Sequence, residues 1–331
     1  MARVDVIIVN YNAGDYLKAC INGLMAQSIS DFRVVIIDNA SHDGSLEALG
    51  ALDDRFLIVR NDGNTGFAAA CNQGAALGQA DWIAMLNPDA VPETDWLEQA
   101  LSCGASTGAA AIGSTQISTE HPDLLDGAGD VYSPLGVAWR GAFGAPVSDA
   151  PGTGTCFGPC AAAALYRRDV FERLGGFDEN FFCYMEDVDL AFRFRLAGEF
   201  AVQSREAVVH HVGSAIAGRT SPFVIYHGTR NRIWTFVKNA PPLMFWLLLP
   251  THLMVNLAFL VRSIAHNRFK PTGKAILDAL RAWPELMAWR RDAQSVRVAS
   301  HGAIMGAMTW SVSKLLARKP DVRPIDNQTA K

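Results

Sequence analysis

The stretch that decides the fold is VDVIIVN, residues 4–10, together with a second apolar run, FRVVIID, at residues 32–38. Both runs are rich in β-branched residues, which is typical of strands that are buried on both faces. Between them, residues 14–27 repeat apolar side chains at the spacing of one helix face. This strand–helix–strand order predicts a βαβ unit with two parallel strands.

Strands and helices continue to alternate outward from this unit as far as about residue 120. The expected elements are strands at 56–60, 82–86 and 110–116 and helices at 66–77 and 93–106. We therefore expect an α/β fold with a mostly parallel sheet flanked by helices. Residues 122–159 break into glycine- and proline-rich loops with short antiparallel strands, where a cover over a substrate would lie. A strand at 161–166, a helix from Arg168 and a helix at 186–196 follow.

The two parts of the chain differ in charge and hydropathy. The 331 residues are 50% apolar and 19% charged, below the roughly 25% charged of an average soluble domain. Residues 1–199 hold 27 acidic and 11 basic residues, whereas residues 200–331 hold 6 acidic and 18 basic residues. From Ser221 onward the pattern is helical. The uncharged run 239–261 is long enough to cross a bilayer, but three prolines divide it.

These features predict a helical, apolar and basic region at residues 239–331 that associates with a membrane. We expect it to lie in the membrane face as a peripheral or monotopic attachment, with the basic residues after the apolar run against anionic lipid. The N-terminus lacks the basic lead and long apolar run of an export signal. The protein is therefore expected on the cytoplasmic side of the membrane.

Several site types are excluded by what the sequence lacks. The turn after the first strand holds neither the Gly-x-Gly-x-x-Gly pattern of a dinucleotide site nor a P-loop. Six scattered cysteines in apolar context predict reduced, buried thiols, and Cys156 with Cys160 alone would make a poor zinc site. The basic half carries no recognised nucleic-acid-binding module.

Polar residues follow four of the predicted strands at the edge where an α/β sheet binds its ligands. They are Asn10 and Tyr11, residues 38–41, residues 61–66 and residues 87–89. Each group alone could be an ordinary turn, because Asn, Asp, Ser and Gly are common turn formers. Together they favour a ligand site in which Asp38 accepts the ring N–H of a uracil or thymine and Tyr11 stacks on the base. Asp89 offers one hard carboxylate for Mg²⁺ or Mn²⁺ shared with substrate phosphates.

A second acidic cluster, Glu186, Asp187 and Asp189, opens the predicted helix at 186–196. Asp189 has Arg193 four residues later and is expected to form a surface ion pair. Asp187 has no such helical partner and points away from Glu186, so it is the better candidate for a general base. The alternative for Asp187 is an exposed first-turn acid that balances the helix dipole.

The chain resembles the inverting glycosyltransferase family 2 with its GT-A fold, especially its rhamnosyltransferase-like members, over about residues 4–240. Each matching motif is weak alone, and the ordered series is specific. The motifs are Val6–Asn12, Asp38–Ser45, Asn64–Ala68, Leu86–Ala90, Gly175–Asp178, Glu186–Asp189, His211–Ser214 and Arg230–Arg232. Where many members have two or three acids in the metal element, this chain has only Asp89, which weakens the case for strict metal dependence.

The resemblance implies a role for each matching residue. It implies that Asp187 is the catalytic base and that Asp89 with His211 holds Mg²⁺ or Mn²⁺. Separately, Glu186, Arg230 and Arg232 are expected to face the acceptor or its diphosphate, because guanidinium groups match phosphate oxygens. The expected nucleotide-sugar residues are Asn10, Tyr11, Asp38, Asn39, Asn64, Gly66 and Asn87. His210 and His211 could instead be an ordinary strand-end pair. Arg219, Arg230, Arg232 and Lys238 could instead be a solvated helix face.

We therefore expect a glycosyltransferase domain at residues 1–238, with a nucleotide-sugar half at 1–120 and an acceptor half at 121–238. The expected reaction moves a sugar, for example rhamnose from a dTDP donor, onto a polyprenyl-diphosphate-linked glycan in cell-envelope polysaccharide synthesis. The membrane region and its lipids complete the expected partners. The alternative is a catalytically silent, nucleotide-sugar-binding scaffold of a membrane assembly.

Overall fold

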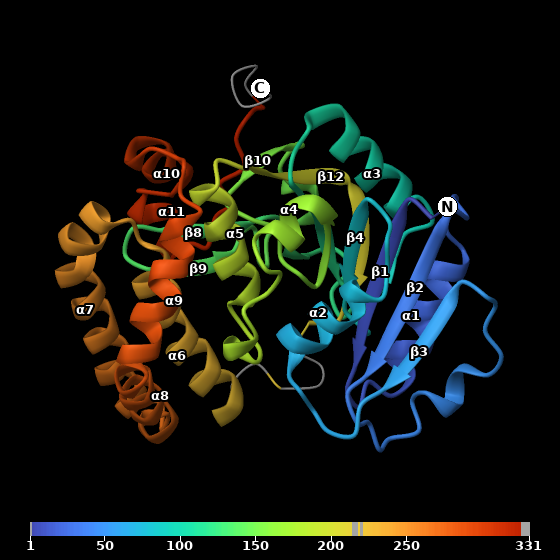
Figure 1. Cartoon of the computed structure of the whole chain (residues 1–331), viewed down its shortest axis with the longest axis horizontal. Coiled ribbons are helices and arrows are strands. Elements are labelled where there is room, and N and C mark those ends of the chain that lie inside the picture. The colour runs from blue at the N-terminus through green and yellow to red at the C-terminus, as the bar shows by residue number, and fades with distance from the viewer. Residues whose placement is uncertain (1, 214–217, 219–220, 326–331) are drawn as a thin grey trace.

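The computed structural model describes residues 2–213, 218 and 221–325. A ten-stranded sheet forms the centre, and helices cover both of its faces (Figure 1). The strands are β1 (Val4–Asn10), β2 (Phe32–Asp38), β3 (Phe56–Arg60), β4 (Trp82–Leu86), β5 (Ala90–Pro92), β6 (Ala111–Ser118), β7 (Leu125–Gly127), β10 (Gly154–Cys156), β11 (Ala163–Arg167) and β12 (Ala201–His211). A separate hairpin pairs β8 (Asp130–Ser133) with β9 (Val137–Arg140).

The N-terminal half of the sheet has the predicted βαβ arrangement. Strands β4, β1, β2 and β3 are parallel neighbours, and every residue of β1 is buried. The flanking helices are α1 (Asp15–Met25), α2 (Phe67–Ala76) and α3 (Trp96–Thr107). Helix α1 buries Leu17, Cys20, Ile21 and Leu24, the apolar face that its spacing predicts. The helices and strands expected before residue 120 are thus confirmed, with ends shifted by up to three residues.

The sheet as a whole is mixed, so the expectation of a mostly parallel sheet is wrong beyond β4. Strand β11 runs antiparallel to both β4 and β6, whereas β12 runs parallel to β6. Two successive reversals restore the original direction, so β12 ends at the same edge as β1, β2 and β4. The local apolar pattern cannot reveal these directions, because long-range connections set them.

Strand β5 completes this edge by pairing antiparallel with the end of β12. In this pairing Ala90 lies opposite His211. Asp89 and His211 are consequently neighbours although 122 positions separate them in the sequence. The short strand β7 pairs with β6 on the other side and brings Asp126 to the same place.

The remaining helices follow the expected positions. They are α4 (Arg168–Arg173), α5 (Glu186–Leu196), α6 (Pro222–Asn239), α7 (Pro242–Ala265), α8 (Phe269–Arg281), α9 (Trp283–Ser295), α10 (His301–Ala307) and α11 (Val312–Leu316). The predicted domain boundary at residue 238 falls one residue before the end of α6. Helix α7 contains Pro250 and is long and apolar enough to cross a membrane by length and composition.

Two hydrophobic clusters join the C-terminal helices to the first 240 residues. In one, Phe192 and Leu196 of α5 pack with Met244 of α7 and with Ile304 of α10. In the other, Phe181 and residues of α6 pack with Phe245 and Leu286. The C-terminal helices therefore share their core with α5, the helix that begins with Glu186 and Asp187.

Candidate active site

The end of β1 is built to hold Asp38 in place. Asn10 is fully buried, and its side-chain amide donates to Asp38 Oδ1 at 2.8 Å and to the hydroxyls of Ser41 and Ser45 at 3.0 and 2.9 Å. The backbone N–H of Ser41 donates to Asp38 Oδ2 at 3.3 Å. A carboxylate accepts about four hydrogen bonds, so Asp38 keeps acceptor capacity. Asn10 therefore positions Asp38 rather than presenting its own amide at the surface.

Asn39 joins the second and third polar strand ends. It is buried, and its amide donates to Asn64 Oδ1 at 2.9 Å and to the carbonyl of Gly66 at 3.3 Å. Its own oxygen accepts from the backbone N–H of Thr65 at 3.1 Å. Asn39 thus ties the end of β2 to the turn before α2 that holds Asn64 and Gly66. In contrast, the Tyr11 side chain is 40% exposed beside Asp38's strand end and is free to stack on a flat ligand.

A buried group of Asp89, His211 and Asp126 lies at the centre of the same edge. His211 Nδ1 lies 2.7 Å from Asp126 Oδ2, and His211 Nε2 lies 3.2 Å from Asp89 Oδ1. All three side chains are nearly inaccessible to solvent. Asn87 also reaches this group, because its amide nitrogen lies 3.5 Å from His211 Nε2.

The charges of this group support one another. Burial alone would raise the pKa of Asp89 and lower that of His211. The hydrogen bond and charge of His211 nevertheless hold the pKa of Asp89 below its usual value. Hydrogen bonds from His211 to Asp126 and Asp89 raise the pKa of the imidazole. The imidazole and the carboxylates therefore favour one another's charged forms.

The donor set of this group fits a divalent cation. Asp126 occupies Nδ1, which leaves Nε2 of a neutral His211 directed toward the Asp89 carboxylate. An outer carboxylate that orients a ligating histidine in this way is the usual support of a protein metal site. Mg²⁺ and Mn²⁺ accept a single carboxylate when phosphate oxygens complete the shell. His210 points elsewhere, with its Nε2 2.6 Å from the exposed Glu93, which agrees with an ordinary strand-end residue.

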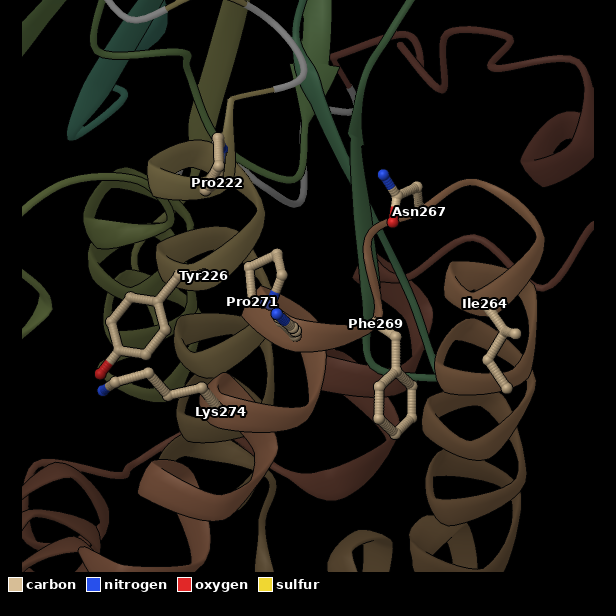
Figure 2. A pocket seen from close by; sticks show the side chains of 8 residues that line it. Pro222, Tyr226, Ile264, Asn267, Phe269, Pro271 and Lys274 are labelled. Atoms are coloured by element: carbon tan, nitrogen blue, oxygen red, sulfur yellow. The ribbon is translucent and has the colours of Figure 1, made fainter.

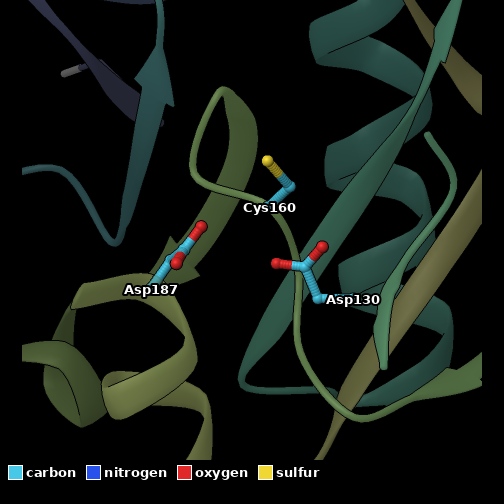
Figure 3. A group of neighbouring side chains, drawn as sticks. All are labelled: Asp130, Cys160 and Asp187. Carbon is cyan, nitrogen blue, oxygen red and sulfur yellow. The ribbon is translucent and has the colours of Figure 1, made fainter. Parts of the chain in front are cut away.

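A second group faces the start of α5, where Asp130, Cys160 and Asp187 come together (Figure 3). One oxygen of each carboxylate and the Cys160 sulfur all lie within 4.8 Å of one another. Figure 3 shows the Asp130 and Asp187 carboxylates pointing into the same gap from different segments. Asp187 Oδ2 accepts from the backbone N–H of Ala161 at 3.1 Å, and its Oδ1 accepts from Val188 N–H at 2.8 Å.

Burial makes both carboxyls of this second group harder to ionise. Burial and then the charge of Asp187 raise the pKa of Asp130 well above its ordinary value. Burial also raises the pKa of Asp187, but the backbone N–H groups of Ala161 and Val188 oppose the shift. Asp187 therefore ionises more readily than Asp130. Burial raises the pKa of Cys160 to about 12, which keeps its thiol protonated and a poor ligand for hard cations.

Arg140 connects the two groups. One of its guanidinium nitrogens pairs with Asp126, and the other donates to Cys160 Sγ at 3.3 Å. The guanidinium thus supplies a fixed positive charge between the His211 group and the Asp187 group. A substrate that spans both groups would lie across this charge.

Glu186 is more deeply buried than its neighbour Asp187. Only 5% of Glu186 is exposed, and its Oε2 has no hydrogen-bond partner among the described residues. Burial, followed by the charge of Asp187, raises the pKa of Glu186 well above its usual value. Glu186 therefore resists ionisation, and its role toward the acceptor or diphosphate stays a prediction.

The loop before α5 is strained. Phe182, Tyr184 and Met185 have φ of 66°, 69° and 70°, which side-chain-bearing residues rarely adopt. Each such residue costs about 1–3 kcal/mol and persists only where surrounding contacts hold it. Asn231 of α6 provides these contacts. Its fully buried amide donates to the carbonyls of Phe181, Cys183 and Tyr184 at 3.0, 2.9 and 2.7 Å.

The basic residues of α6 contact different partners. Arg230 donates to the carbonyl of Phe181 at 3.0 Å and lies over the Trp234 ring. Arg232 donates to Asn256 of α7 at 2.7 Å, and burial lowers the pKa of its guanidinium to about 10. Arg219 lies outside the described residues.

Asp189 forms its ion pairs in the core of the protein and not at the surface. Asp189 is fully buried, and Arg193 Nε donates to its Oδ2 at 2.8 Å. Lys238 lies 3.0 Å from the same oxygen and also pairs with Asp178. The expected Asp189–Arg193 pair is thus confirmed, but it lies in the core and not at the surface.

Three residues of this site, Asp126, Asp130 and Arg140, do not appear among the residues expected from the sequence. All three come from 122–159, which the sequence predicts only as loops and short strands. The available signal is the run LLDGAGD at residues 124–130, in which two acids flank a small-residue turn. Asn231 stands between Arg230 and Arg232 in the sequence.

Comparison with known proteins agrees with this geometry. The family model described as glycosyl transferase family 2 matches residues 5–175. A relative in Mycobacterium tuberculosis (strain ATCC 25618 / H37Rv), an N-acetylglucosaminyl-diphospho-decaprenol L-rhamnosyltransferase, is 29% identical over 291 residues, which cover 76% of this chain and 93% of the relative.

Two solved structures share the fold. A Pyrobaculum calidifontis mannosyltransferase in complex with GDP-Man and Mn²⁺ superposes with a TM-score of 0.54 at 19% identity and covers 88% of this chain and 86% of its own. The structure of GalNAc-T7 with UDP, GalNAc and Mn²⁺ superposes with a TM-score of 0.59 at 13% identity and covers 72% of this chain and 48% of its own. Because the family model spans more than half of the chain, this protein belongs to glycosyl transferase family 2 and is a glycosyltransferase.

Proposed function

We propose that this enzyme transfers rhamnose from a dTDP-linked donor, with inversion, to a polyprenyl-diphosphate-linked glycan. The proposal places the reaction at the cytoplasmic membrane face, in cell-envelope polysaccharide synthesis. The observation that carries it is the meeting of two acidic groups at one sheet edge, one suited to the leaving diphosphate and one to the acceptor. The similarity to the mycobacterial decaprenol-linked rhamnosyltransferase supports rhamnose as the sugar and a lipid-linked acceptor.

The nucleotide would lie over the ends of β1 and β2. Asp38, held by Asn10, accepts the ring N–H of the base, and the exposed Tyr11 ring stacks on it. Asn39 and the turn of Asn64 and Gly66, which it contacts, would shape the neighbouring wall. This arrangement directs the diphosphate toward the centre of the edge, where Asn87, Asp89 and His211 lie.

Asp89 and His211 would hold a divalent cation, with Asp126 fixing the imidazole. When bound, Mg²⁺ or Mn²⁺ neutralises charge that develops on the departing diphosphate. The Mn²⁺ complexes of the two structural neighbours support a cation of this class. Arg140 adds a fixed positive charge close to the same place.

Asp187 would act on the acceptor. As the acceptor hydroxyl oxygen forms its bond to the anomeric carbon, its proton passes to a carboxylate oxygen of Asp187. The bond from the anomeric carbon to the diphosphate oxygen breaks, and its electron pair leaves with the diphosphate. Attack from the side opposite the leaving group inverts the anomeric centre. Asp130, which binds its proton more tightly, leaves Asp187 ionised for this step.

A donor panel tests the proposed function. Purified enzyme is mixed with dTDP-rhamnose or with UDP- and GDP-sugars, a polyprenyl-diphosphate-linked N-acetylglucosamine acceptor and Mn²⁺ or Mg²⁺. We expect nucleoside diphosphate release and an inverted rhamnosyl linkage, measured by coupled assay and NMR, only with dTDP-rhamnose. Release with another donor alone would reassign the sugar. Binding without release across the panel would favour the scaffold alternative.

A further inference from the structure

A cleft of about 1090 Å³ opens between the start of α6, the end of α7 and the start of α8 (Figure 2). Nothing in the proposed reaction uses it so far. Its lining is Pro222, Tyr226, Ile264, Asn267, Phe269, Lys270, Pro271 and Lys274. In Figure 2 Ile264 lies on α7, and the Phe269 ring lies beside it at the start of α8.

The cleft combines an apolar wall with cationic side chains. Ile264 and Phe269 are 61% and 50% exposed and present their apolar surface to the cleft. Lys270 and Lys274 are both exposed lining residues. Such a surface suits a ligand with an apolar body and an anionic head.

Asp278, an acidic residue near this cleft, is already hydrogen-bonded and ion-paired. Asp278 accepts from the Tyr226 hydroxyl at 2.9 Å and pairs with Lys274 and with Arg281. Lys274 Nζ also lies 4.6 Å from the centre of the Tyr226 ring. With one carboxylate against two lysines and Arg281, the polar wall keeps a net positive charge.

The start of α6 forms a wall between this cleft and the loop that carries the proposed base. On one side, Pro222 and Tyr226 line the cleft. On the other side, Phe223 packs edge-on against Phe182 and Tyr184, with ring centres 6.2 Å apart in both cases. The loop from Phe182 leads directly into Glu186 and Asp187. A molecule in the cleft is therefore one helix away from the segment that positions the base.

We propose that this cleft binds the isoprenoid chain of the acceptor lipid close to its diphosphate. The inference rests on the proposed function, which supplies an acceptor with a long apolar chain and an anionic linkage. The chain would lie against Ile264, Phe269 and Pro271, and the lysines would face the anionic end.

Acceptors with different tails test this role. The double variant I264A/F269A is compared with L253A, which removes an equally exposed leucine, 58% accessible, from α7 outside the cleft. We expect the KM of the double variant for a long-chain polyprenyl acceptor to rise about tenfold or more, since two apolar contacts are lost. Its KM for a short-chain, water-soluble analogue and for the donor should stay unchanged. An equal rise for both acceptors, or the same rise in L253A, would overturn the inference.

Direct binding separates this inference from the proposed reaction. Farnesyl diphosphate is titrated against the full-length protein by tryptophan fluorescence, beside inorganic diphosphate and phosphatidylglycerol vesicles that contain no isoprenoid. We expect saturable binding of farnesyl diphosphate that I264A/F269A and Lys270→Ala weaken about tenfold, with little response to inorganic diphosphate. If the variants instead lose vesicle binding equally, the cleft is a general membrane contact and the inference fails. If binding holds but no donor supports transfer, only the proposed function fails.

Discussion

At the scale of single residues, Asp187 owes its suitability as a base to the groups around its carboxylate. Two backbone N–H groups favour its charged form, and burial favours its neutral form. Asp130 takes the more buried position and the more strongly raised pKa. The pair can therefore hold a single proton on Asp130 while Asp187 stays available to the acceptor hydroxyl.

Replacing Asp187 by Asn removes the proposed base and preserves the side-chain shape. We expect transfer to fall by about 10²–10⁴-fold, the usual contribution of a general base. Donor binding should change by no more than a few-fold, because Asp187 lies with the acceptor group and away from Asp38. Turnover assays beside calorimetric titration of the donor measure both effects. Retention of more than about a tenth of the activity would assign the base to another residue.

Asp130→Asn tests how the two carboxyls divide their proton. A base works only when ionised, so activity falls as pH drops through the pKa of Asp187. Asp130 binds its proton more tightly, so it is neutral while Asp187 titrates, and no charge on Asp130 acts on the pKa of Asp187. We therefore expect the acid limb of kcat/KM in Asp130→Asn to stay within about half a unit of its wild-type position, with activity near neutral pH largely retained. A shift of about one unit toward lower pH would show that Asp130 ionises before Asp187 and would contradict this division of the proton.

Asp126 acts on the proposed cation only through His211. Asp126→Asn keeps a side chain of similar size but loses the charge that orients Nδ1–H. Loss of such a partner lowers metal affinity about 10–100-fold. We expect the Mn²⁺ concentration for half-maximal activity to rise accordingly, and saturating Mn²⁺ should restore most activity.

Asp89→Ala should weaken diphosphate binding mainly when the cation is present. EDTA should abolish the difference in binding between the variant and the wild-type protein.

At the scale of elements, α5 begins with three acids and depends on α6 for its position. The strained loop at 182–185 and the amide of Asn231 form one unit, because that amide contacts three carbonyls of the loop and its approach. Gly66 belongs to the same unit. Its φ is 88°, and a Cβ at this position would lie 2.6 Å from the Phe182 ring. The turn that holds Gly66 and the loop at 182–185 are thus in direct contact.

Asn231→Asp replaces the donating amide with a carboxylate facing three carbonyls. We expect kcat to fall at least tenfold while the KM for the donor stays within a few-fold, because the base loop moves and the nucleotide end of β1 does not. Asn239→Ala is the control, since it removes a buried amide of the same helix that contacts Asp189 and not the loop. Loss of a buried hydrogen-bonding group costs about 1–3 kcal/mol of stability, so both variants should melt earlier. Equal kcat in the two variants would deny Asn231 a positioning role.

Elements with a strong local pattern could be predicted from the sequence. Strand β1 and helix α5 match their expected limits, because apolar spacing within each segment determines which face is buried. Strands β5 and β7 have three residues each, too few to show a period, and form only by pairing with β12 and β6. Asp126 reaches the site through the pairing of β7, and Asp130 and Arg140 lie opposite each other in the short β8–β9 hairpin. For this reason the sequence pointed to Asp89, His211 and Asp187 but not to the residues that support them.

At the scale of the whole molecule, the helices after α7 return to the catalytic part. Helices α8 and α9 pack against α6, and α9 and α10 pack against α5. Near the C-terminus, Arg323 exchanges backbone hydrogen bonds with Thr155, and the carbonyl of Lys319 accepts from Trp139 at 3.0 Å. Figure 1 shows α8, α9 and α10 beside α5 and α6. If α7 crossed a bilayer, everything after it would lie on the opposite side from these partners.

This arrangement predicts that α7 lies in the membrane face. Its outward residues Trp246, Leu247, Met254 and Leu257 are each more than 60% exposed and would enter the headgroup region, while Met244 and Phe245 hold the helix to the core. A tag placed after Lys331 should therefore be accessible to protease from the cytoplasmic side and protected from the outside of intact cells. High salt should release the protein only partly, because apolar burial remains after the basic residues are screened. A tag reached only from the outside would establish a spanning α7 and require α8–α10 to leave α5 and α6.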